Sequence, residues 1–107
     1  MVVAALASAT QRFASNVSRW TQPRWAASSR SGRSKADVAF ELLQRVADLA
    51  AEAEGLEHRA VPRLDNDLAM GDQLRVLVAD LLAAQPPAET LTGAIAMIDE
   101  AHREINT

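Results

Sequence analysis

Apolar residues recur every three or four positions in four separate stretches of this 107-residue chain. That spacing places them on one face of an α-helix, whereas a half-buried strand alternates apolar and polar residues. No alternating run of useful length is present, and the four prolines fall between the stretches, where they interrupt helices. We therefore expect an all-α fold, and the length is that of one domain or less.

The first stretch predicts an amphipathic helix within residues 1–20, whose apolar face carries Leu6, Phe13 and Val17. Pro23 ends this helix because proline cannot continue the hydrogen-bond ladder. Residues 21–34 have no apolar period and are rich in Ser, so we expect a flexible linker.

The remaining residues, 35–107, predict a small three-helix bundle that folds without the preceding residues. Ser34 is a good N-cap and Gly55 a good terminator, which bounds the first helix of this body at about 35–54. Connections between the three helices are short enough to suggest antiparallel neighbours.

The second helix of the body follows a connection over residues 55–66 and is capped by Asp65, Asn66 or Asp67. Val61 and Leu64 flank Pro62 in that connection, so we expect it to tuck apolar side chains onto the body. Pro87 marks the start of the last helix.

The charge changes sign between Lys35 and Ala36. Six basic residues and no acid precede this point, whereas fourteen acids and five arginines follow it. Such a basic arm is suited to an acidic surface, including that of its own body. The candidate partner-binding residues of the arm are its cations and tryptophans: Arg12, Arg19, Trp20, Arg24, Trp25, Arg30, Arg33 and Lys35.

The chain offers little for catalysis. It has no cysteine, and every serine lies in the arm, where a flexible segment could not hold a nucleophile against a base. Asp99 and His102 form a single Asp-x-x-His, half of what a di-metal bundle requires. The acidic run that begins at Asp65 lacks the ligands of a calcium loop. We expect no enzyme, no cofactor or metal, and no small-molecule substrate.

The function that remains is a non-catalytic helical interaction or assembly module with a protein partner or with itself. Its small, aromatic-poor body leaves apolar area for another helix to cover, and the N-terminal helix is the first candidate, by folding back or by swapping into a neighbour. The alternatives are nucleic acid, through phosphate contacts and stacking, or an anionic membrane surface.

The expected location is the cytoplasm. Alanine is the commonest residue and ten arginines stand against one lysine, which is typical of a GC-rich bacterial gene. The late first cation, Arg12, argues against a secretory signal. A mitochondrial location is the alternative for a eukaryotic source, because residues 1–34 are rich in Arg and Ser and contain no acid.

Overall fold

The computed structural model describes residues 1–106 and confirms the all-α prediction. Within that range the one strand-like pairing is an isolated bridge between Ser28 and Ser34. The elements follow one another as α1 (Val2–Val17), α2 (Gln22–Ala26), α3 (Lys35–Glu54), the 3₁₀ turn η1 (Asp67–Ala69), α4 (Met70–Ala83) and α5 (Ala88–Ile105).

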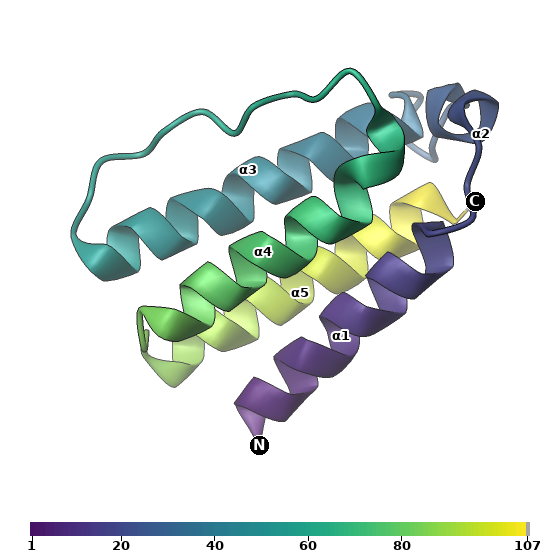
Figure 1. The fold of residues 1–107 in the computed structure, drawn as a ribbon. Coiled ribbons are helices and arrows are strands. Elements are labelled where there is room, and N and C mark those ends of the chain that lie inside the picture. The colour runs from purple at the N-terminus through teal and green to yellow at the C-terminus, as the bar shows by residue number, and fades with distance from the viewer. Residues whose placement is uncertain (107) are drawn as a thin grey trace.

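The four long helices form one bundle, in which α1 and α3 each pack against both α4 and α5 (Figure 1). Helices α3 and α4 run in the same direction, and α1 and α5 run in the other. This corrects the expectation of antiparallel neighbours for α3 and α4, whereas α4 and α5 run antiparallel as expected. Residues 56–66, which we call the strap, cross the length of the bundle to join α3 to α4. An extended chain covers roughly 3.3 Å per residue and a helix about 1.5 Å, so eleven residues can return along a twenty-residue helix.

Local capping explains why the helices begin and end where they do. The Ser34 hydroxyl accepts a hydrogen bond from the Asp37 N–H at 3.0 Å, which starts α3 at the predicted residue. Gly55 ends the helix with a φ of 73°, a left-handed conformation that glycine adopts without a steric penalty. Asn66 caps η1 by accepting a hydrogen bond from the Leu68 N–H at 2.9 Å.

The N-terminal helix is part of the core. Leu6, Phe13 and Val17 are buried in the same cluster as the apolar residues of α4 and α5. The separate three-helix body predicted for residues 35–107 is therefore corrected to a four-helix bundle that includes α1. The whole molecule exposes 6029 Å², close to the ~5,800 Å² typical of a monomer of this mass. Its own N-terminal helix thus covers part of the apolar surface of the body.

The segment 21–34 is structured, in contrast to the predicted flexible linker. It contains α2, whose Trp25 is fully buried and meets Trp20 with ring centroids 4.8 Å apart. Beyond α2, the Ser29 N–H donates to the Arg33 carbonyl at 2.7 Å and closes a turn. Burial of a large indole ring stabilises the fold by more than the conformational freedom of an unstructured polar segment would favour the unfolded segment. The amino-acid composition alone does not reveal this.

A glycine permits the close contact between α1 and α4. A Cβ added at Gly71 would lie 3.3 Å from the Val17 side chain and 3.4 Å from the Ala14 backbone. By contrast, a Cβ added at Gly93 in α5 would have no such neighbour within 4 Å. Gly71 therefore serves packing, although it weakens the helix that contains it.

Removal of residues 1–34 should abolish cooperative folding of the remainder. The deletion exposes the partners of Leu6, Phe13 and Val17, each worth ~1.5–3 kcal/mol, against a total stability of about 5–15 kcal/mol. Thermal melts followed by circular dichroism would measure this, with Ser15→Ala in the full chain as a control of near-wild-type stability. A cooperative, wild-type-like melt of the fragment would contradict the four-helix core.

The two helical glycines should respond oppositely to substitution. Gly93→Ala should raise the free energy of unfolding by ~0.5–1 kcal/mol, because alanine is the better helix former and the site has room. Gly71→Leu should lower it by ~1–3 kcal/mol through overpacking against α1. Urea denaturation would measure both, and equal effects of the two substitutions would argue against the close α1–α4 contact.

Candidate functional site

The basic arm meets the acids of its own chain. Arg12 on α1 lies 3.7 Å from the Asp99 carboxylate on α5, and Arg33 lies 2.6 Å from the Glu41 carboxylate on α3. Both pairs are largely exposed, and such pairs contribute only ~0–1 kcal/mol each. Their main effect is to reduce the positive field that the arm would present to an external partner.

Three of the predicted partner-binding residues are inaccessible. Trp20, Trp25 and Lys35 are 7%, 0% and 6% exposed, respectively. The cations Arg24 and Lys35 lie 4.5 and 5.4 Å from the centroid of the Trp20 ring. We correct the expectation for these three residues, because the tryptophans pack at the end of the bundle instead of offering stacking faces to a base or a lipid headgroup.

Arg30 and the serines beside it belong to a turn that is fixed to the end of α5. The hydroxyls of Ser31 and Ser29 donate to one Glu104 carboxylate oxygen at 2.7 and 2.9 Å, and the Arg30 N–H donates to the Glu104 carbonyl at 3.4 Å. The Ser31 hydrogen bond is the main cause that lowers the pKa of Glu104 below its ordinary value. Arg19 is exposed just beyond the end of α1. The arm therefore forms part of the folded surface, with its cations spread over several elements.

His102 lies between α1 and α5. Its ring is 5.6 Å from the Phe13 ring, and Asp99 and Arg12 are the charged groups that act on it. Partial burial lowers the pKa of His102 below 6.5, Asp99 opposes this shift, and Arg12 adds to it. Among residues 1–106, no group of three His, Cys, Asp or Glu side chains could hold a metal ion.

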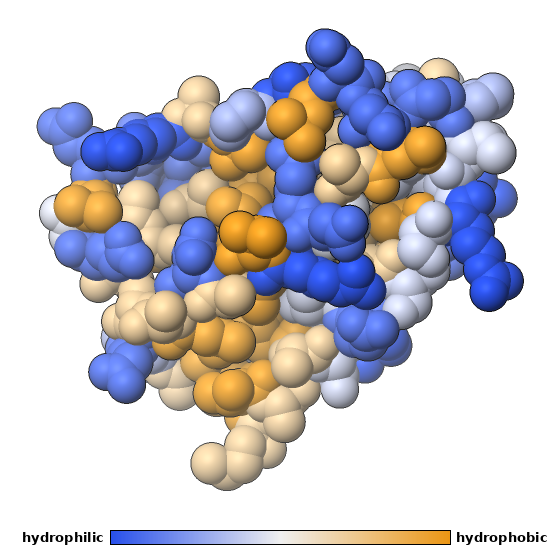
Figure 2. Space-filling view, viewed as in Figure 1, coloured by the Kyte–Doolittle hydropathy of each residue, from blue (hydrophilic) through white to orange (hydrophobic). Residues whose placement is uncertain are grey.

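An apolar cleft lies elsewhere, between the strap and α4. Leu64 and Leu68 are 44% and 47% exposed, and Val76 on α4 is 60% exposed. In Figure 2, apolar side chains lie among hydrophilic ones on the face where the strap leads into α4. We call the cleft at this place the strap groove. It has a volume of about 360 Å³ and is lined by Val61, Pro62, Leu64, Ala69, Asp72, Gln73, Val76 and Leu77.

The sequence contained one indication of this groove. Val61 and Leu64 are large apolar residues in the connection before η1, and the sequence predicts that both tuck onto the body. Val61 does so and is half-buried, whereas Leu64 remains exposed. Helical periodicity does not apply to the strap, so only the fold reveals that Leu64 and Val76 share one groove.

Comparisons with known proteins assign no family. No protein-family model matches the chain, and no curated protein and no solved structure match it significantly. None of the described helices is both long and apolar enough to cross a membrane.

The His102 environment predicts lower stability in mild acid. The His102 ring binds a proton more tightly in the unfolded chain than in the folded chain, because folding lowers the pKa of His102. The free energy of unfolding should therefore fall as the pH drops from about 7 towards 5. His102→Gln should flatten this slope in urea titrations at a series of pH values. An unchanged slope would show that His102 is not responsible.

Proposed function

We propose that this chain is a non-catalytic helical module that binds an amphipathic helix of a protein partner in the strap groove. The observation that carries the proposal is that Leu64 and Val76, two large apolar side chains that are 44% and 60% exposed, line one cleft. Exposed apolar side chains that cluster beside a groove are typical of sites for partner proteins.

The size of the groove favours a helix over a second globular copy. A stable interface buries about 800 Å² per partner and involves roughly 20–30 residues on each side. A cleft of about 360 Å³ accommodates a few anchoring side chains of one helix. The molecule also exposes little more surface than a typical monomer of its mass, so it needs no second copy to complete its core.

The polar groups at the groove suit a helix with one polar face. Asp72 and Gln73 lie beside the apolar lining, and Arg75 pairs with Asp72 at 2.8 Å on the exposed surface of α4. An apolar centre with a polar rim is the usual organisation of a protein interface.

The alternative, nucleic acid or an anionic membrane surface bound through the arm, has less support. Stacking on bases or insertion at a lipid interface would require exposed aromatic rings, and Trp20 and Trp25 are buried. The arm's remaining exposed arginines provide charge alone, which is an unspecific signal.

Capture from native lysate by purified protein tests the proposal. The double variant Leu64→Ser/Val76→Ser should fold, because both side chains are exposed, and should lose the partner that the wild type retains. Val3→Ser is the matched control, since Val3 is also half-exposed but lies on α1 outside the groove lining. It should retain the partner.

A second variant separates the two functions. Arg24→Gln/Arg30→Gln/Arg33→Gln should retain the protein partner. Salt-sensitive binding of DNA or RNA that this variant loses would favour the nucleic-acid alternative. Capture of the same partner by the groove variant and by the wild type would contradict docking in the strap groove.

A further inference from the structure

We propose that the surface of α3 and α4 beneath the strap is a binding site for an extended peptide, which the strap occupies in cis. The ligand class is an extended segment with a large apolar residue followed by a Val-Pro-Arg-like run. This proposal concerns the contacts of the strap with α3 and α4, and it holds whether or not a helix binds in the strap groove.

The side chain of Gln44 on α3 holds the strap through its backbone. The Gln44 Oε1 accepts a hydrogen bond from the Val61 N–H at 2.8 Å, and the Gln44 Nε2 donates to the Arg59 carbonyl at 2.9 Å. Asp48 accepts a second hydrogen bond from the same Nε2 at 2.8 Å, which fixes the orientation of the amide. One amide thus binds both a donor and an acceptor of an extended backbone, a contact that any peptide could make.

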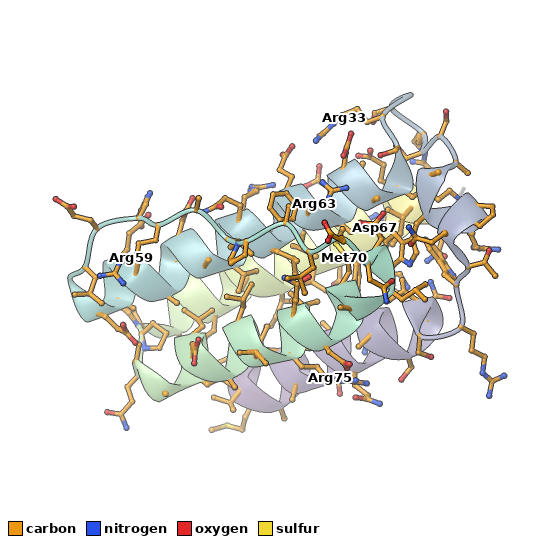
Figure 3. The ribbon with its side chains drawn as sticks, turned by 45° about the horizontal axis from the view of Figure 1, so that its top comes forward. Arg33, Arg59, Arg63, Asp67, Met70 and Arg75 are labelled. Atoms are coloured by element: carbon orange, nitrogen blue, oxygen red, sulfur yellow. The ribbon has the colours of Figure 1, made fainter. Side chains whose placement is uncertain are left out.

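Side chains of the strap add selectivity. Val61 is half-buried against the core, and the Pro62 carbonyl accepts a hydrogen bond from Gln73 on α4 at 3.3 Å. The Arg63 guanidinium lies 4.9 Å from the centroid of the Phe40 ring, and its nitrogens approach Asp37 at 3.3 Å and Asp67 at 3.5 Å. Figure 3 shows Arg63 near Asp67, with Arg59 further along the strap. Apolar, proline and arginine positions therefore each have a place on α3 and α4.

The strap is held loosely enough to be displaced. Within residues 56–66 every residue except Val61 is exposed, and the segment has no helix or strand of its own. Segments with few buried contacts and exposed backbone open locally at low cost, without unfolding the rest of the protein. Long connections without secondary structure are also commonly functional.

The strap does not fill its site. A cleft of about 300 Å³ remains between the strap and the helices, with Ala47, Ala50 and Ala51 among the residues that line it. Ala60 lines the same cleft from the strap, between the two backbone groups that Gln44 binds. A larger apolar side chain in place of Ala60 would bury additional surface. A peptide supplied in trans could therefore bind more tightly than the strap itself.

A chemical-shift titration tests the site. Residues 59–65 of the full-length chain are replaced by a Gly/Ser segment of equal length, and the probe is a synthetic peptide of residues 57–66. Saturable binding is expected, and the same peptide with Ala60→Leu should bind at least about fivefold more tightly because it fills the cleft. The wild-type chain, whose own strap competes, should bind either peptide at least about tenfold more weakly.

Matched variants identify the contacts. In the strap-replaced chain, Gln44→Ala should abolish binding, whereas Gln11→Ala, a surface glutamine on α1, should leave it unchanged. A peptide with Val61→Asp and Arg63→Glu should fail to bind. No saturable binding to a folded strap-replaced chain, or equal binding by the Gln44→Ala chain, would overturn the proposal.

Hydrogen exchange in the wild-type chain keeps the proposal testable if the replaced chain does not fold. The Val61 amide should be protected from exchange well below the level of core amides of α4. Gln44→Ala should reduce the protection of Val61 at least tenfold without changing the protection of the α4 amides. Protection of Val61 equal to that of the core would show that the strap is not displaceable. An absence of protection at the Val61 amide would show that Gln44 does not hold the strap.

Discussion

The contact between the apolar face of α1 and the helices α4 and α5 is the interaction on which the remaining structure depends. Phe13 and Leu6 are fully buried there, and Gly71 allows the backbones of α1 and α4 to approach. With α1 in place, each of α1 and α3 has two neighbours, and the core is continuous from Leu6 to Ile105. Without it, two helices of a small bundle would expose apolar faces to water, at a cost comparable to the entire stability of such a domain.

The return of the arm to its own body also determines what the surface can offer. Arg12 and Arg33 approach acids of α5 and α3, and the two tryptophans close the end of the bundle. Part of the charge contrast within the sequence is thus satisfied within one chain. Exposed large apolar side chains remain at Leu56 and Leu64 on the strap, as well as at Val3 on α1 and Val76 on α4.

The strap exists because α3 and α4 run in the same direction. A parallel pair of neighbouring helices requires a connection as long as the helices themselves, and that connection must lie on the surface. The strap groove and the cleft lined by Ala47, Ala50 and Ala51 are both consequences of this crossover, and Val61, Pro62 and Leu77 line both of them.

The sequence by itself determined the all-α class and the limits of α3, because capping at Ser34 and termination at Gly55 are local effects of a few neighbouring atoms. It did not determine the parallel α3–α4 pair, the burial of Trp25 or the groove beside Val76. Those features depend on contacts between residues far apart in the chain, where apolar stripes specify that a face is buried but not which helix covers it. Only the tertiary structure decided that α1 covers α4 and α5, and therefore which residues of the arm and the strap remain accessible.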